Sequence, residues 1–280
     1  MKKIIIFVAV FLITFNIQAQ ANDVEALAYN VSFGAVFGTI GSLINKKKED
    51  KIGKTILRAS AGGAFGGLLT FGSKKLLREA YINEDWKYIW GAKILNAAGT
   101  SIKENATLNR NLYENWNINF GFTRIEMNTK GKFRINYKIM PVALAYTIDA
   151  FLRFDNFELN KSLETGEFIF STKLNNAKGA TLAGYVVLNK NSVNDYSTVT
   201  HEITHIYQSN DFSILNAYYS NPISNFKSKY RTVNFVNKHT YLDFHYLPLR
   251  LLYNYETKTA INYYDNFLEH EAGYYSNTLH

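Results

Sequence analysis

The chain has 280 residues, a net charge of +8, no cysteine and only three prolines. The lack of cysteine excludes disulfide bonds and a lipid anchor on an N-terminal cysteine. Because the basic residues are dispersed among acidic and aromatic ones, the composition indicates a mildly cationic surface and argues against a nucleic-acid-binding protein.

Residues 1–21 have the pattern of a secretory signal peptide. Two lysines at the start precede an apolar stretch over residues 4–15, and the small residues Ala19 and Ala21 offer cleavage sites. An uncleaved anchor is less well supported, because the apolar run is shorter than the roughly 20 residues that span a membrane. We therefore expect an exported protein, periplasmic or envelope-associated, with secretion as an alternative. The remaining chain, about 260 residues, can form one catalytic domain with an N-terminal appendage.

Residues 22–80 form a glycine-rich region that predicts a helical hairpin. Two apolar segments, residues 27–44 and 56–71, flank a charged turn at residues 45–51. Glycines recur at short intervals in both segments: Gly34, Gly38 and Gly41 in the first, and the pairs Gly62–Gly66 and Gly63–Gly67 in the second. Such spacing lets two helices touch backbone to backbone, as small residues do in membrane helix pairs.

The hairpin has two alternative placements, in or on a membrane and packed against the catalytic domain. The stretch between Arg58 and Lys74 has 15 residues, which is about 22 Å of helix against a hydrocarbon core of about 30 Å. The long basic side chains at its ends extend that reach. Membrane association through residues 22–80 is therefore a hypothesis beside simple docking on the domain.

The middle of the chain changes from a helical to a strand period after residue 113. Five stretches predict strands of one antiparallel-leaning sheet: residues 118–122, 133–139, 154–159, 167–172 and 181–188. Strands followed by helices indicate an α+β domain, with the next helix packed on the sheet. Residues 210–256 are expected to be loops and helices that wall a cleft.

Residues 201–205 read His-Glu-Ile-Thr-His and lie in a helix predicted over residues 197–209. On a helix, His201 and His205 lie one turn apart on the same face, so both imidazoles can bind one Zn²⁺. Glu202 lies beside that face, at the position of a general base for metal-assisted hydrolysis. The plainer alternative is an amphipathic helix whose histidines only pack or face solvent.

The context of the motif favours the metal site. A buried strand at residues 181–188 and a loop at 189–196 precede the motif helix, for which Asp195 or Ser197 is available as N-cap. This order of strand, loop and helix suits a zinc peptidase, because the edge of the strand can hold an extended substrate by main-chain pairing.

A catalytic zinc keeps three protein ligands, so a third ligand is required. The pattern H-E-x-x-H-x-x-G-x-x-H would place it at Asp211. Gln208 replaces the glycine, so the helix is expected to continue and carry Asp211 away from the metal. Glu269 is the better candidate, because it lies on a helix predicted over residues 258–275, where the small Ala272 lets two helices approach.

Two neighbours of Glu269 are alternative ligands, Glu271 first and His270 less so. Either glutamate can instead be a solvated charge on a helix face, which is the usual role of glutamate on a surface helix.

These two motifs resemble the gluzincin branch of zinc metallopeptidases, in which a glutamate of a downstream helix completes the site, often as Glu-x-x-Ala followed by Asp. Residues 269–272 read Glu-His-Glu-Ala, and Gly273 stands in place of the aspartate. The motif segment also looks like a set of uncharacterised bacterial proteins of this type. The resemblance implies a zincin-like domain over residues 81–280. It also implies the site residues: His201, His205 and Glu269 as ligands of Zn²⁺, and Glu202 as catalytic base.

The sequence thus predicts an exported zinc metallopeptidase that hydrolyses peptide bonds of a peptide or protein substrate with a metal-activated water and Glu202 as base. The donor that stabilises the developing oxyanion is left open among five residues: Tyr207, His239, Tyr241, His245 and His270. Two other functions compete with this prediction. One is a non-enzymatic membrane or interaction protein whose glycine-rich hairpin is the working part, and the other is a zinc hydrolase of non-peptide substrates.

Overall fold

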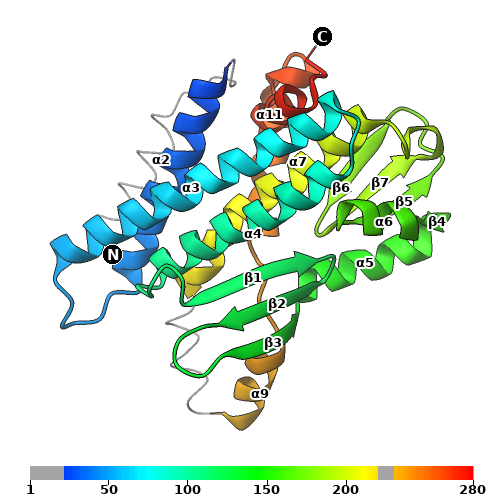
Figure 1. Cartoon of the computed structure of the whole chain (residues 1–280). Coiled ribbons are helices and arrows are strands. Elements are labelled where there is room, and N and C mark those ends of the chain that lie inside the picture. Colours follow the sequence, from blue (N-terminus) through cyan, green and yellow to red (C-terminus); the bar gives the residue numbers. More distant parts are fainter. Residues whose placement is uncertain (1–21, 220–229, 280) are drawn as a thin grey trace.

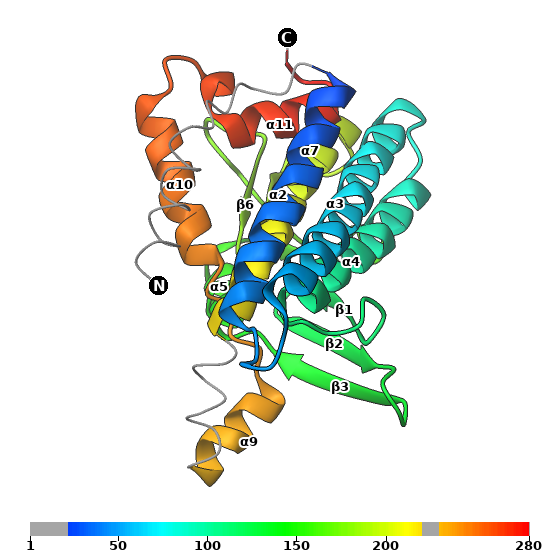
Figure 2. The ribbon, with the colours of Figure 1, turned by 90° about the vertical axis from the view of Figure 1, so that its left-hand side faces the viewer.

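The computed structural model describes residues 22–219 and 230–279, so the predicted signal peptide at residues 1–21 lies outside the described residues. The described residues form a mixed α+β fold, in which long helices lie beside two small sheets (Figures 1 and 2). The α+β class predicted from the sequence is confirmed at this level.

Three long helices, α2 (Asp23–Ile44), α3 (Ile52–Ile82) and α4 (Lys87–Thr107), lie side by side with α3 in the middle (Figure 2). The glycines bring α2 and α3 into backbone contact, because a Cβ built on Gly67 would overlap the carbonyl oxygen of Asn30. Helix α3 is longer than the predicted segment 56–71, and the predicted domain boundary at residue 80 falls inside it.

The first sheet is antiparallel and consists of β1 (Asn115–Phe120), β2 (Thr123–Asn128) and β3 (Arg134–Ile139). The sequence analysis missed β2, because the side chains that it buries are charged. Arg124 and Glu126 are both buried on β2 and form an ion pair of 2.9 Å. A strand of this kind lacks the apolar alternation by which strands are recognised.

The second sheet has the strand order β4-β5-β7-β6. Its strands are β4 (Asn156–Phe157), β5 (Phe168–Thr172), β6 (Gly179–Leu182) and β7 (Tyr185–Asn189). Strands β5 and β7 are parallel, whereas β4 and the edge strand β6 are antiparallel to their neighbours. The prediction of one antiparallel-leaning sheet is wrong, because the strands divide between two sheets.

The strand predicted over residues 181–188 is also wrong as a single element, because β6 and β7 form a hairpin. Gly184 makes the turn with a φ of +84°, a conformation that residues with a Cβ rarely adopt. A glycine inside an apolar run was therefore the sequence signal for the turn. Helix α5 (Pro141–Arg153) connects the two sheets, and α6 (Leu159–Thr165) connects β4 to β5 within the second sheet.

The motif helix α7 (Tyr196–Phe212) packs on the second sheet, as predicted. It follows the short helix η1 (Lys190–Ser192) and precedes η2 (Ser213–Tyr219). The main core cluster joins α3, α4, β5, β7 and α7 through eleven buried residues: Leu77, Ala80, Ile89, Ala92, Ile169, Val186, Leu188, Val199, Ile203, Ile206 and Tyr207. Helix α3 of the hairpin therefore shares its core with the motif helix.

The C-terminal region contains α9 (Arg231–His239), α10 (Tyr246–Thr259), η3 (Tyr263–Asp265) and α11 (Phe267–Ser276). The single helix predicted over residues 258–275 is wrong in its first half, since Ile261 is 93% exposed in the connection after α10. Polar caps explain the break. Asn262 and Asp265 form a capping box around η3, and Asn266 caps the start of α11.

Among the described residues, α2 alone is long and apolar enough to cross a membrane, by length and composition only. A signal sequence and the core helix of a soluble protein pass the same test, and 39% of the apolar window of α2 is buried. This apolar helix near the N-terminus gives only general support for export.

The glycine contacts generate a prediction for stability. Gly67→Ala is expected to lower the free energy of unfolding by about 1–3 kcal/mol, because the added methyl group forces α2 and α3 apart. Gly53→Ala is the matched control on the same helix, because a Cβ there meets nothing within 4 Å. The control is expected to be neutral or to stabilise the protein by up to about 1 kcal/mol. Urea denaturation of both variants measures the difference, and equal effects would contradict the close packing.

Candidate metal centre

Helix α7 presents the two motif histidines on one face. Asp195 is its N-cap and accepts a hydrogen bond from the Ser197 amide at 3.1 Å. Val199 and Ile203 anchor the opposite face in the core, so His201 and His205 point toward α11. Their ring centroids lie 5.0 Å apart.

Helix α11 supplies the third residue of the cluster. Its N-cap Asn266 accepts from the amides of Leu268 and Glu269, which places Glu269 in the first turn, where a negative charge is favoured by the helix dipole. The Glu269 Oε2 atom lies 3.1 Å from His201 Nε2 and 3.2 Å from His205 Nε2. The sequence prediction that these three residues come together is therefore met in the geometry.

The three residues fit a divalent metal. One ligand atom from each lies within 4.8 Å of the others. Tetrahedral zinc with bonds of about 2.0–2.1 Å separates its ligand atoms by about 3.3–3.4 Å, close to the oxygen-to-nitrogen distances above. Two imidazole nitrogens and one carboxylate oxygen are also the donor set of catalytic zinc sites with an open fourth position. The geometry does not by itself select zinc over another divalent metal.

Glu202 is buried beside the cluster, and β6 holds it there. The Thr181 hydroxyl donates to Glu202 Oε2 at 2.8 Å. Gly179 leaves the space that the carboxylate occupies, because a Cβ there would lie 2.8 Å from Glu202 Oε1. Burial raises the pKa of Glu202 above its usual value, although the nearby His205 and His201 oppose the shift. A carboxylate with a raised pKa is suited to proton transfer near neutral pH.

Hydrogen bonds and opposite charges hold Glu269 to the two histidines. Burial opposes its ionisation, but hydrogen bonds with His201 and His205 hold the pKa of Glu269 well below its usual range. Burial likewise opposes protonation of His205, yet its hydrogen bond with Glu269 raises the pKa of His205 to about 9. Because histidine ligates metals in its neutral form, a metal that binds here must displace that proton.

Two tyrosines also reach the cluster, and the sequence analysis missed both. Tyr253 of α10 donates to Glu269 Oε1 at 2.7 Å, and Tyr263 of η3 donates to Glu269 Oε2. Tyr263 lies in the first half of the helix that was predicted wrongly over residues 258–275. Tyr253 lies in the stretch 210–256 that was expected to wall a cleft, but no local pattern singled it out.

The alternative ligands are held by other groups. The Glu271 carboxylate lies 2.8 Å from the Lys74 ammonium and accepts from Gln208 at 2.9 Å. Asp211 lies on the continued helix α7 and pairs with Lys74 at 2.8 Å and with Lys103 at 2.5 Å. Neither carboxylate belongs to the metal-binding group.

Position 273 cannot hold the aspartate that the resemblance expects. A Cβ on Gly273 would lie 2.7 Å from Tyr264 and 2.8 Å from Leu279. The Nδ1 atom of His201 contacts the hydroxyl of Ser276 at 3.3 Å instead. A hydroxyl on the same helix thus takes the place of the missing carboxylate.

The five residues considered as oxyanion donors do not join the cluster. Tyr207 lies in the main core, Tyr241 donates to Glu104 at 2.9 Å, and His245 contacts Asn216 at 2.8 Å. The other two are His239, which is exposed on α9, and His270, whose pKa is lowered by burial. None of the five forms a hydrogen bond with Glu269 among those found in the described part of the chain.

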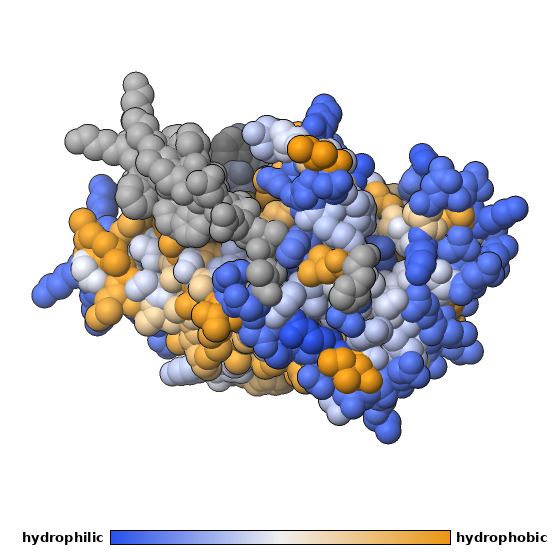
Figure 3. All heavy atoms as spheres, turned by 90° about the horizontal axis from the view of Figure 1, so that it is seen from above, coloured by the Kyte–Doolittle hydropathy of each residue, from blue (hydrophilic) through white to orange (hydrophobic). Residues whose placement is uncertain are grey.

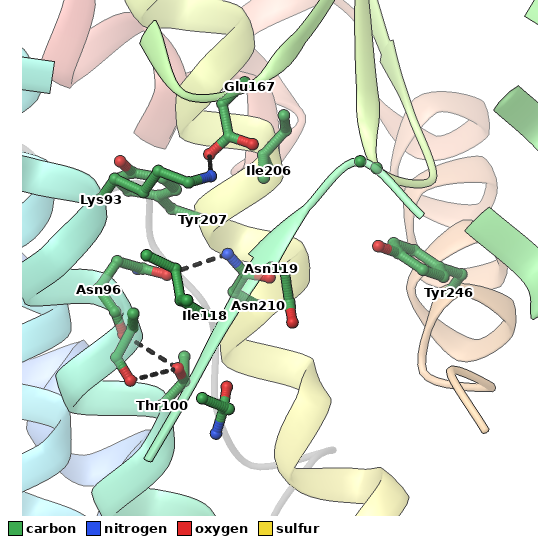
Figure 4. A pocket seen from close by; sticks show the side chains of 14 residues that line it. Lys93, Asn96, Thr100, Ile118, Asn119, Glu167, Ile206, Tyr207, Asn210 and Tyr246 are labelled. Atoms are coloured by element: carbon green, nitrogen blue, oxygen red, sulfur yellow. Dashed lines mark hydrogen bonds and ion pairs between the residues drawn. The ribbon is translucent and has the colours of Figure 1, made fainter. Parts of the chain in front are cut away.

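Two cavities lie near the residues discussed above. One of about 210 Å³ is lined by Glu269, Tyr253 and Tyr263, and so opens on the cluster. The other lies between α4, β1 and α7, where Lys93 and Glu167 point toward each other and form an ion pair of 2.7 Å (Figure 4). It measures about 20 Å³, which is space for about one water molecule. The cavity beside Glu269 is therefore the candidate cleft.

Comparison of the chain with models of protein families, with curated proteins and with solved structures finds no match.

Metal binding tests the cluster directly. The full chain is expected to bind about one Zn²⁺, and His201→Ala or Glu269→Ala should each weaken binding by more than about 100-fold, since each removes a ligand atom. His239→Ala is the control, because this exposed histidine lies on α9, outside the cluster. Competition with a chromogenic chelator gives the affinities. Equal zinc affinity in all four proteins would exclude a metal site at this cluster.

Proposed function

We propose that the protein is an exported zinc-dependent metallopeptidase, in which His201, His205 and Glu269 hold the metal and Glu202 is the general base. The observation that carries the proposal is the position of Glu269 Oε2, within 3.2 Å of both histidine Nε2 atoms. The buried Glu202 lies on the same helix, one residue after the first ligand. The gluzincin resemblance supports the same assignment of roles.

Each residue of the site has a separate role in the proposed hydrolysis. A bound zinc supplies a Lewis acid that makes water a nucleophile near neutral pH. Glu202 accepts the proton from the attacking water and delivers it to the leaving nitrogen, a role that its raised pKa favours. The Thr181 hydroxyl holds one carboxylate oxygen of Glu202 and so sets the direction of the other. The buried surroundings exclude bulk water from these transfers.

Tyr253 and Tyr263 are the proposed donors to the carbonyl oxygen of the substrate. Both hydroxyls already reach the carboxylate of the third ligand and line the cavity beside it. Burial raises the pKa of both phenols far above the working range, so both keep the proton that they would donate. Each hydroxyl has one proton, so it would turn that proton from Glu269 to the developing oxyanion. A hydrogen bond made in this way stabilises the transition state more than the ground state.

A peptide in extended conformation is the proposed substrate. Strand β6 is the edge strand of its sheet, and its Thr181 touches the general base. An edge strand offers main-chain donors and acceptors to an added strand, which gives affinity with little dependence on side chains. The scissile bond of such a peptide would lie near Glu202. The second candidate substrate, a non-peptide ester or amide, lacks this support because it cannot extend the sheet.

Glu202→Gln is expected to retain zinc and to lower peptide hydrolysis by at least about 10²–10⁴-fold, because the amide cannot accept the proton. Cleavage of a mixed peptide library, followed by mass spectrometry, measures the effect. Glu84→Gln, in an exposed turn, is the control. Full activity of Glu202→Gln would remove this residue from the mechanism. A zinc-loaded wild type that cleaves no peptide would favour the non-enzymatic alternative.

We also propose that the outer face of the α2–α3 hairpin contacts a membrane surface. Leu57, Phe65 and Leu68 follow one face of α3 and are 71%, 48% and 45% exposed. Apolar residues gather on the side of the molecule that carries the hairpin, whereas the opposite side over the small strands is mainly hydrophilic (Figure 3). Six basic residues and two acidic ones occupy the adjoining stretch 45–58. Apolar side chains beside clustered lysines favour an anionic lipid surface.

The proposed contact is peripheral: α3 lies on the membrane surface and does not insert into the bilayer. Its Lys74 is fully buried and pairs with Asp211 and Glu271 inside the protein. A helix with this side chain at the protein core cannot leave the domain to span a bilayer without exposing paired charges. The hairpin is therefore proposed to lie on the surface, with α3 held by the domain.

Flotation with lipid vesicles tests this surface on protein purified after export. Binding to vesicles that contain phosphatidylglycerol is expected to exceed binding to pure phosphatidylcholine. A double variant, Leu57→Asp with Phe65→Asp, should lower the bound fraction several-fold, because charges enter the apolar face. Leu163→Asp is the control, since this residue is 63% exposed on α6. Unchanged flotation of the double variant would place the lipid contact elsewhere or remove it.

A further inference from the structure

Gln208 forms three hydrogen bonds where α7 meets α11. Its Nε2 donates to the carbonyl oxygen of Leu268 at 2.8 Å and to Glu271 Oε2 at 2.9 Å, and its Oε1 lies 2.8 Å from His205 Nδ1. The side chain is buried. It occupies the position at which the longer zinc-peptidase pattern has a glycine.

These partners determine which way the amide points. A carbonyl oxygen and a carboxylate oxygen only accept hydrogen bonds, so the amide nitrogen must face both of them. The amide oxygen therefore faces His205, and the Nδ1 atom of His205 must carry a proton. With its proton on Nδ1, a neutral His205 directs the lone pair of Nε2 toward Glu269, where a metal would lie.

A buried charge cluster fixes the Glu271 end of this chain of hydrogen bonds. Lys74 of α3 lies 2.8 Å from Glu271 Oε1 and 2.8 Å from Asp211 Oδ2, and the other oxygen of Asp211 lies 2.5 Å from Lys103 of α4. Lys74 also donates to Asn30 of α2 at 3.0 Å. Two cations and two carboxylates balance each other, which is the condition under which buried charges are tolerated.

We propose that Gln208 is a positioning residue that sets the tautomer and orientation of His205, and that Lys74, acting through Glu271, holds Gln208 in place. This inference rests on the proposed metal centre. It assigns to α3 of the glycine-rich hairpin an indirect role in that centre. Contacts from Asn30 through Lys74, Glu271 and Gln208 to His205 join four helices: α2, α3, α11 and α7. Close approach of α2 and α3 is needed because Asn30 and Lys74 meet across it.

Zinc affinity and imidazole NMR of the full chain, purified in mild detergent, test the proposal without reference to hydrolysis. Gln208→Met keeps the length of the side chain and removes its hydrogen bonds. It is expected to weaken zinc binding by about 10–100-fold, as loss of an outer partner of a ligand does. In the zinc-loaded wild type, His205 should show a slowly exchanging Nδ1 proton in ¹⁵N–¹H spectra, and this signal should be lost or exchange faster in Gln208→Met.

A pair of lysine variants separates positioning from stability. Lys74→Met and Lys93→Met each remove a buried, ion-paired ammonium, and only Lys74 connects to Gln208. Both are expected to lower the denaturation midpoint, whereas Lys74→Met alone should weaken zinc binding by about tenfold or more. Equal zinc affinities for the two lysine variants, or wild-type affinity and an unchanged His205 signal in Gln208→Met, would overturn the proposal. A wild type without zinc affinity would instead refute the metal centre itself.

Discussion

The fold depends on the burial of one ammonium group, that of Lys74, where α3, α7 and α11 meet. Burial alone would lower the pKa of Lys74, but Asp211 and Glu271 raise it above the ordinary value. The lysine therefore stays charged, and both carboxylates must remain close to it. Removal of any one of these charged groups leaves the buried charges unbalanced, which costs more free energy of folding than the loss of a surface ion pair. The three helices that carry the cluster are thereby fixed in register.

That register brings the three residues of the candidate metal centre together. His201 and His205 come from α7, Glu269 comes from α11, and the distances between their ligand atoms depend on how these helices cross. Ala272 is fully buried one turn after Glu269, where a small side chain allows a close crossing. N-caps fix the position of each helix along its axis: Asp195 caps α7, and Asn266 caps α11 three residues before Glu269. Helix ends and helix crossings together thus determine where the ligands meet.

The parts of the site that local patterns encode could be predicted. The spacing of His201 and His205 follows from the helical repeat, and Glu269 stands in a recognisable segment near a small residue. Tyr263 was missed because polar caps separate η3 from α11 where apolar spacing suggested one helix. Tyr253 was not singled out because its local pattern on α10 does not distinguish it from the other aromatic residues of that stretch. The short β6–β7 hairpin was missed inside an apolar run, although Gly184 marks its turn.

The role of Lys74 was beyond sequence reasoning for a different reason. A lysine at the end of an apolar helix has the same local pattern whether it reaches toward a lipid headgroup or enters the protein core. The ion-pair partners determine which of the two places the lysine takes. These partners, Asp211 and Glu271, lie 137 and 197 residues further along the chain. The charged face of β2 shows the same limit, since the buried Arg124 finds Glu104 on another element. Long-range pairing of charges has no periodic signature.

Glu202 favours the proposed hydrolytic centre over a purely structural ion cluster. Both histidines form hydrogen bonds with Glu269, and two tyrosine hydroxyls donate to the same carboxylate. Glu202 takes no part in these hydrogen bonds. Yet Glu202 is buried beside them, with Thr181 as the side-chain partner of its carboxylate among the described residues and with a raised pKa. A buried carboxylate with so few partners reduces stability. Such a loss of stability is characteristic of groups that are retained for chemistry. The position of Glu202 beside the proposed ligands fits the role of general base in the proposed hydrolytic centre.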